Sequence, residues 1–82
     1  MTDEIRRVIK EHARLRADVD ELPDDADLFQ AGMTSHASIN VMLALENAFD
    51  VEFPDRLLSR SVFSSIASIR AALDEIAIED VA

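Results

Sequence analysis

The sequence contains no cysteine, which excludes disulfides and leaves no thiolate to act as a nucleophile. Its only histidines are His12 and His36, so the chain offers at most two imidazole ligands for a metal ion. No apolar run is long enough to span a bilayer, and the first four residues lack the basic-then-apolar order of a secretion signal. We therefore expect one cytoplasmic domain, residues 1–82, that holds no metal ion.

Basic residues are also few: 8 Lys and Arg stand against 17 Asp and Glu, giving a net charge of −9. Nucleic-acid affinity rests on Lys and Arg that neutralise phosphates, and anionic membranes likewise attract cationic segments. The charge predicts no binding to nucleic acid or membrane and is compatible with basic protein partners. The carboxylates between residues 18 and 27 do not suggest calcium, because they lack the alternating ligands, central glycine and terminal glutamate of an EF-hand loop.

Apolar residues recur at helical spacing, and no strand pattern or internal repeat is present, so the expected fold class is all-α. The spacing predicts helices over residues 3–16, 35–50 and about 65–77, followed by a frayed tail over 78–82. Ser64 or Ser65 is expected to cap the last helix.

Two connections join these helices. Residues 17–34 predict a long acidic loop, in which Pro23 blocks continuation of the first helix. A loop of this length inside a compact domain should be functional or anchored. Residues 51–62 predict irregular backbone or a short helix, with one or both of Leu57 and Leu58 turned inward.

The predicted helix over 35–50 has two unlike faces. The face expected to contact the core collects Ser38, Ile39, Val41, Met42, Leu45 and Phe49. The opposite face collects His36, Asn40, Leu43 and Asn47. Because this second face has few charges and one large aliphatic side chain, we predict that it contacts a partner.

Ser35 begins this helix three residues after Gly32, the only glycine of the chain. A lone glycine here indicates a backbone angle that other residues dislike, or close approach of another group. Thr34 or Ser35 caps the helix. His36 is poorly placed to activate Ser35 as a nucleophile, because adjacent helical residues point about 100° apart. We therefore expect that Ser35 either caps the helix or is modified. The free N–H groups at the start of a helix would stabilise a phosphate ester on its hydroxyl.

Three segments carry a resemblance to a known family. They are Asp27-Leu28-Phe29-x-x-Gly32-x-x-Ser35, Leu45-Glu46-x-x-Phe49 and Phe53-Pro54-Asp55. Together with the length, the acidity and the long first loop, they make the chain resemble the acyl carrier proteins over nearly its whole extent. The resemblance implies a small four-helix bundle, with three main helices and a short third helix.

In that family, a serine matched here by Ser35 receives 4′-phosphopantetheine from coenzyme A, delivered by a separate phosphopantetheinyl transferase. The resemblance implies that Ser35 bears this arm, whose thiol supplies the nucleophile that a cysteine-free chain lacks. Cargo would be held there as a thioester. The chain itself would not be an enzyme; it would present the cargo to partner enzymes and be a monomer when free.

The chain departs from the fatty-acid carriers around this serine. Their common Asp-Ser-Leu motif is replaced by a serine between Thr34 and His36. This neighbourhood, and the segment from Phe53 to Arg60, resemble stand-alone aminoacyl carrier proteins, which are loaded by ligases related to class II aminoacyl-tRNA synthetases. The resemblance implies a small amino acid as cargo. A fatty-acyl, polyketide or other acyl cargo, and an unmodified helical interaction module, stay as alternatives.

The expected partners are the transferase, an amino acid:[carrier protein] ligase and a downstream acceptor enzyme that the sequence does not identify. Leu43 on a polar face, and two arginines beside an apolar pair, indicate where they bind. The residues predicted to contact partners are Thr34, His36, Ala37, Asn40, Leu43, Asn47, Arg56 and Arg60.

Overall fold

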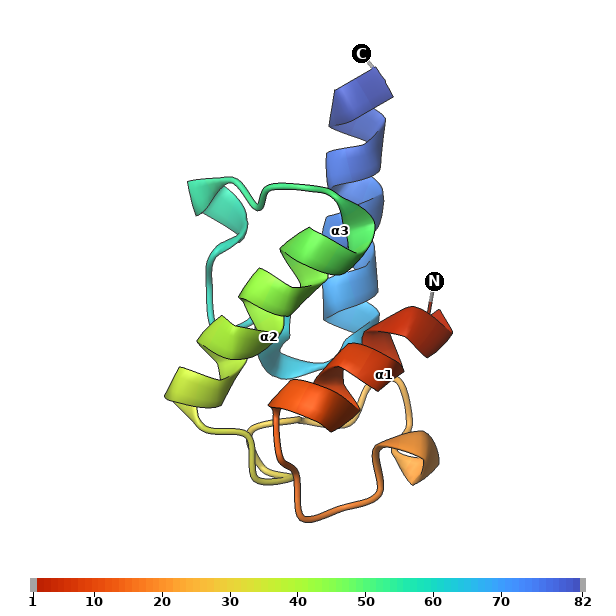
Figure 1. Cartoon of the computed structure of the whole chain (residues 1–82), viewed down its shortest axis with the longest axis vertical. Coiled ribbons are helices and arrows are strands. Elements are labelled where there is room, and N and C mark those ends of the chain that lie inside the picture. Colours follow the sequence, from red (N-terminus) through yellow and green to blue (C-terminus); the bar gives the residue numbers. More distant parts are fainter. Residues whose placement is uncertain (1, 82) are drawn as a thin grey trace.

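The described part of the chain folds into three α-helices (Figure 1). The computed structural model describes the backbone of residues 2–81 and the side chains of residues 2–77. The helices are α1 (Thr2–His12), α2 (Ser35–Phe49) and α3 (Ile66–Val81). Single turns of 3₁₀ helix lie between them, namely η1 (Val19–Glu21), η2 (Asp55–Leu57) and η3 (Val62–Ser64). α1 packs against both α2 and α3, and no described residue lies in a strand, which confirms the all-α prediction.

The prediction of a four-helix bundle is not confirmed, because the expected short third helix is only the single turn η2. Pro54 precedes this turn, and Leu58 ends it with φ −93° and ψ 52°. Leu57 is its one buried side chain, whereas Leu58 is 45% exposed. A short helix is stabilised mainly by the packing of its apolar face. The one buried side chain of this segment is too little to stabilise a helix longer than the single turn.

α1 is shorter than the predicted helix over 3–16. The Ala13 N–H still donates to the Ile9 carbonyl at 2.8 Å, but Arg14 then takes a left-handed conformation with φ 53°. A residue in this conformation ends a helix because it turns the chain away from the helical path. The chain passes from there into the long loop.

α3 is longer than predicted, because its helical backbone continues to Val81; Ala82 lies outside the described residues. No glycine or proline interrupts residues 66–81, and buried Ile69 and Ile76 anchor the helix. Ser65 caps it, because its Oγ accepts a hydrogen bond from the Ser68 N–H at 3.1 Å. Among the described residues, no helix combines the length and apolar character needed to cross a bilayer.

The core is built from apolar side chains of all three helices and of the loops between them. Its largest fully buried members are Ile5, Ile9, Leu28, Val41, Leu45, Ile66 and Ile69. Phe53 and Phe63 pack with ring centroids 5.4 Å apart and an interplanar angle of 60°. No polar or charged side chain is buried within the described part of the chain, so burial of apolar surface is what holds the helices together.

The long first loop is tied to α1 by two basic side chains. Arg6 donates hydrogen bonds to the Val19 carbonyl and to the Asp24 carboxylate, each at 2.6 Å. Lys10 donates to Asp20 at 3.0 Å, and this hydrogen bond, together with the Asp20 charge, raises the pKa of Lys10. These contacts fix the acidic part of the loop against α1.

The same loop is tied to the start of α3 by backbone hydrogen bonds. The Leu28 N–H donates to the Ser64 carbonyl at 2.7 Å, and the Ala67 N–H donates to the Asp24 carbonyl at 2.8 Å. Leu28 itself is completely buried. The loop that leads into α2 is therefore anchored, as its length predicts.

Candidate functional site

A tight turn over residues 27–34 leads into α2. The Asp27 carboxylate accepts hydrogen bonds from the N–H groups of Phe29 at 2.9 Å and Gln30 at 3.3 Å. The Met33 N–H donates to the Leu28 carbonyl at 3.0 Å, and both of these side chains are buried. The exposed part of the turn is thus held between two core anchors.

Gly32 supplies the backbone angle that this turn requires. Its φ is 118°, which residues with a side chain rarely adopt. A Cβ at this position would lie 3.5 Å from the Arg16 nitrogen and 3.7 Å from the Arg16 Cγ, which are ordinary contacts. The backbone angle, and not a lack of space, therefore explains the single glycine.

Gly32→Ala is expected to lower the free energy of unfolding by about 1–3 kcal/mol, because alanine is strained at this angle. Urea unfolding followed by circular dichroism measures the loss. Gln30→Ala is the matched control, since Gln30 is exposed in the same turn, and its expected change is within about 0.5 kcal/mol. Equal losses in the two variants would show that the angle of Gly32 is not the cause.

Thr34 caps α2 and leaves Ser35 free. Thr34 has extended backbone angles, and its Oγ1 accepts a hydrogen bond from the Ala37 N–H at 3.0 Å. Ser35 is the first residue of the helix and is exposed. Within the described residues, no hydrogen bond involves the Ser35 hydroxyl; its carbonyl accepts one from the Ser38 hydroxyl at 2.6 Å. Capping therefore does not account for Ser35.

Thr34→Ala should destabilise the protein by about 0.5–2 kcal/mol, the usual effect of removing a helix cap. Thr34→Ser keeps a hydroxyl acceptor at the same place and should restore most of the stability. Thermal unfolding of both variants beside the Ser35→Ala protein gives the comparison. If Ser35→Ala lost more stability than Thr34→Ala, the assignment of the cap to Thr34 would be wrong.

The neighbourhood of Ser35 offers no catalytic apparatus. His36 makes no hydrogen bond to Ser35, and the described residues contain no group of three or more His, Cys, Asp or Glu that could hold a metal ion. A serine nucleophile needs a base that removes its proton. What the geometry offers instead is an accessible primary hydroxyl at a rigidly held helix start.

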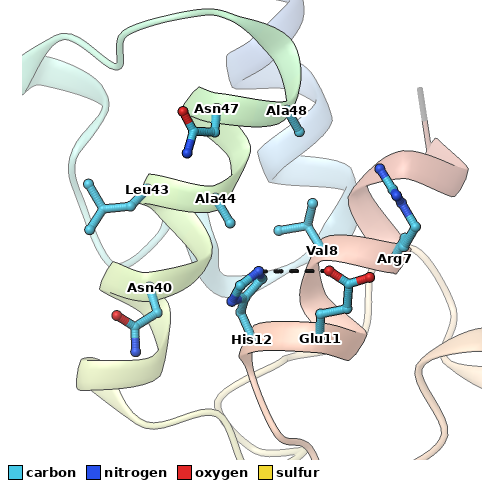
Figure 2. Close-up of a pocket in the computed structure, with 9 residues that line it drawn as sticks. All are labelled: Arg7, Val8, Glu11, His12, Asn40, Leu43, Ala44, Asn47 and Ala48. Atoms are coloured by element: carbon cyan, nitrogen blue, oxygen red, sulfur yellow. Dashed lines mark ion pairs between the residues drawn. The ribbon is translucent and has the colours of Figure 1, made fainter.

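The predicted partner face of α2 is exposed. Leu43 is 52% exposed, and Asn40 and Asn47 lie on either side of it along the helix. Figure 2 shows these three side chains beside a groove between α1 and α2, with His12 of α1 directed toward Glu11, whose carboxylate lies 3.9 Å from the His12 Nε2. Leu43 points away from α1 in this view, and about half of its surface is exposed to solvent.

The predicted contact residues fall into separate places. A cavity of about 380 Å³ beside Ser35 is lined by Thr34, His36, Ala37 and Asn40, together with residues of α1, its end and Gly32. Leu43 and Asn47 line the groove of Figure 2, which Asn40 also joins. Arg60 lies on another side of α2 with Ser38 and Ile39. Arg56 is in none of these places, because it donates to Glu75 of α3 at 2.7 Å.

Ile39 was assigned by periodicity to the core face of α2, and the structure shows this assignment to be wrong. Ile39 is 54% exposed and lines an apolar groove with Met42, Leu58 and Phe63. The segment that could cover it forms only the single turn η2, and Leu58 at its end is itself exposed. This groove, close to Ser35 along α2, is a candidate contact surface that the sequence did not reveal.

Comparisons with known proteins agree with this geometry. Residues 3–76 match the family model described as the phosphopantetheine attachment site. The chain is 46% identical, over 69 residues, to an aminoacyl carrier protein of Agrobacterium fabrum, a match that covers 84% of this chain and 83% of the relative.

Solved structures show the same similarity. One match is a chain in the crystal structure of an engineered Bradyrhizobium japonicum glycine:[carrier protein] ligase complexed with carrier protein from Agrobacterium tumefaciens and AMP. Its TM-score is 0.87 at 43% identity, covering 90% of this chain and 99% of that one. A solution structure from Agrobacterium tumefaciens matches with a TM-score of 0.77 at 41% identity over 100% of both chains. The chain therefore belongs to the phosphopantetheine-attachment family and is a carrier protein, whose prosthetic group is 4′-phosphopantetheine.

Proposed function

We propose that Ser35 bears the 4′-phosphopantetheine and that the chain carries a small amino acid on it as a thioester. The observation that carries the proposal is that Ser35 is exposed at the start of α2 while Thr34 caps the helix. A phosphate ester at this position meets the free N–H groups of the first helical turn. The residues present therefore fit the prosthetic group.

Attachment consumes coenzyme A and needs a transferase. The Ser35 oxygen forms a bond to phosphorus, the phosphoanhydride bond of coenzyme A breaks, and adenosine 3′,5′-bisphosphate leaves. The proton of the hydroxyl passes to a base of the transferase, because no side chain of the described residues is hydrogen-bonded to the Ser35 hydroxyl. The attached group supplies a thiol, which this cysteine-free chain lacks.

The relatives support an aminoacyl cargo. One is named an aminoacyl carrier protein, and another is the carrier protein in a complex with a glycine:[carrier protein] ligase. We infer that a ligase of this kind loads a small amino acid, glycine first among the candidates, and that an acceptor enzyme then removes it. Residues 1–82 would act as a single carrier domain in the cytoplasm, monomeric when free and bound to neither nucleic acid nor membrane.

The contact with these enzymes is inferred to surround Ser35 and to continue along α2. Its members are Thr34, His36, Ala37, Asn40, Leu43, Asn47 and Arg60. Exposed Leu43 supports the α2 part, because an apolar side chain on a polar face gains from being covered by a partner. Arg56 has the least support, since Glu75 already neutralises its charge.

The experiment is intact-mass spectrometry in two steps. The apo protein is first incubated with coenzyme A and a broad-specificity phosphopantetheinyl transferase, and then with glycine, ATP and a glycine:[carrier protein] ligase. We expect one phosphopantetheine mass in the first step and one glycyl mass in the second. The glycyl mass should disappear on treatment with hydroxylamine, which cleaves thioesters.

Each step can fail separately. If no phosphopantetheine were added, the chain would be an unmodified interaction module. If the arm were added but no amino acid were loaded, and the protein purified from its own cell carried a fatty-acyl or polyketide mass, the aminoacyl cargo would be wrong. Mass spectrometry of that native protein reports the cargo directly.

A further inference from the structure

The basic side chains of the chain divide into two groups. Four of the eight Lys and Arg residues pair with carboxylates, in the pairs Arg6–Asp24, Arg7–Glu4, Lys10–Asp20 and Arg56–Glu75. The other four are Arg14, Arg16, Arg60 and Arg70, and within the described residues none of them forms an ion pair. In a protein with 17 acidic residues, carboxylates are plentiful enough that these exceptions need an explanation.

Three of the four surround the turn that presents Ser35. Arg16 donates its backbone N–H to the Ala31 carbonyl at 3.4 Å, and its side chain passes beside Gly32. The Arg60 guanidinium lies 3.9 Å from the centroid of the Phe29 ring. Arg14 lines the cavity that Gly32 and Thr34 also line. We call these three arginines, Arg14, Arg16 and Arg60, the cationic collar.

Few carboxylates lie near the arginines of the collar. Among the residues that the structure describes, no Asp or Glu lines the cavity that contains Arg14 or the groove that contains Arg60. The one acidic residue of the turn is Asp27, whose carboxylate accepts hydrogen bonds from the N–H groups of Phe29 and Gln30. The first turn of α2 contains no acidic residue either. The places around Ser35 therefore carry the three arginines and, in the turn, the single carboxylate of Asp27.

The collar is too wide for a single phosphate. The cavity beside Arg14 and the groove beside Arg60 share no lining residue, so the collar reaches different sides of the start of α2. A phosphate contacts only groups within hydrogen-bond distance of its oxygens. A surface of this breadth matches the surface of a protein.

We propose that the cationic collar is the docking surface for the loading ligase, and that the ligase presents Asp and Glu residues around the opening that receives the arm. The inference rests on the proposed function, and it reverses the expectation of basic partners that net charge alone gives. Charges at the rim of an interface act mainly by steering the encounter, so they affect association more than chemistry. The collar would guide Ser35 and its arm to the opening.

The test uses charge-reversal variants of the intact protein, each first converted to the phosphopantetheine form and verified by mass. Arg14→Glu, Arg16→Glu and Arg60→Glu are compared with Arg70→Glu, which changes net charge equally but lies beside Thr2, to whose hydroxyl Arg70 donates at 3.2 Å. The apparent KM and kcat for the carrier are measured with a glycine:[carrier protein] ligase at low and high salt. Circular dichroism confirms that every variant is folded, and Arg→Gln variants replace any that is not.

For each collar variant we expect KM at low salt to rise about ten-fold with kcat unchanged, and Arg70→Glu to stay within about two-fold. The KM of the unmodified sequence should rise with salt, and the variants should lose this dependence. Unchanged or lowered KM in the collar variants, or an equal rise in Arg70→Glu, overturns the proposal. A salt-independent loss of kcat would also overturn it, since that indicates contact with the arm itself. If phosphopantetheine attached neither to the unmodified sequence nor to any of the variants, the proposed function itself would be refuted.

Discussion

Ser35→Ala is expected to abolish attachment of phosphopantetheine completely, with no mass added after prolonged incubation with coenzyme A and a transferase. The loss is total because the Ser35 oxygen becomes part of the bond that forms, so no neighbouring contact can substitute for it. The fold should be unaffected, since the hydroxyl makes no hydrogen bond among the described residues and Thr34 retains the cap. Intact mass reports the first result and circular dichroism the second.

Ser38→Ala is the matched control for this variant. Ser38 lies one turn along α2 and is half-buried, and its hydroxyl donates to the Ser35 carbonyl. This variant should accept the arm at the normal stoichiometry. Mass addition that persists in Ser35→Ala would place the arm on another residue. Partner binding that stays undiminished in Ser35→Ala would favour an interaction module, and turnover without added cofactor would favour an enzyme.

A candidate attachment residue could be named from the sequence because its motifs resemble those of the acyl carrier proteins; the local features alone left open whether Ser35 only caps the helix. The single glycine, the apolar anchors and the start of a patterned helix all point to the segment from Asp27 to Ser35. The sequence could not decide whether Thr34 or Ser35 caps the helix, because both residue types cap well and helix starts shift by a residue. The hydrogen bond from the Ala37 N–H to the Thr34 Oγ1 separates the two roles.

The surface around the site could be predicted less well. A helical wheel describes one helix, whereas the burial of Ile39 depends on whether another segment covers it. The sequence of residues 51–62 did not show whether this segment forms a helix or irregular backbone. In the structure it forms only the single turn η2, and Ile39 and Leu58 are exposed. The cationic collar was also not predicted as a set, since Arg60 is far along the chain from Arg14 and Arg16.

The backbone angles at Gly32, before α2, and at Arg14, after α1, have different causes, one local and one tertiary. Gly32 has the residue type that a positive φ favours, so the sequence indicated an unusual backbone angle as one of two explanations. Arg14 takes a positive φ without any such preference, so the end of α1 gave no local signal. The burial of Ala13, at 2% exposure, indicates that packing holds the chain in this conformation.

Leu28→Ala should destabilise the protein by about 2–5 kcal/mol, the range for removing a buried leucine side chain. Leu28 is 0% exposed although it lies in a loop, and its backbone bonds both Ser64 and Met33. A domain of this size has a stability of only about 5 kcal/mol or somewhat more, so the variant would be close to unfolding at ambient temperature. Urea unfolding at low temperature measures the difference.

Leu58→Ala makes the same chemical change at a side chain that is 45% exposed, and its expected effect is within about 0.5 kcal/mol. The contrast tests whether the loop before Ser35 belongs to the core. If the loop were only a flexible tether, Leu28→Ala would resemble Leu58→Ala in stability. If Leu28 anchors it, the variant should also accept phosphopantetheine more slowly in proportion to its unfolded fraction, because the transferase would then meet a serine that no longer stands at a fixed helix start.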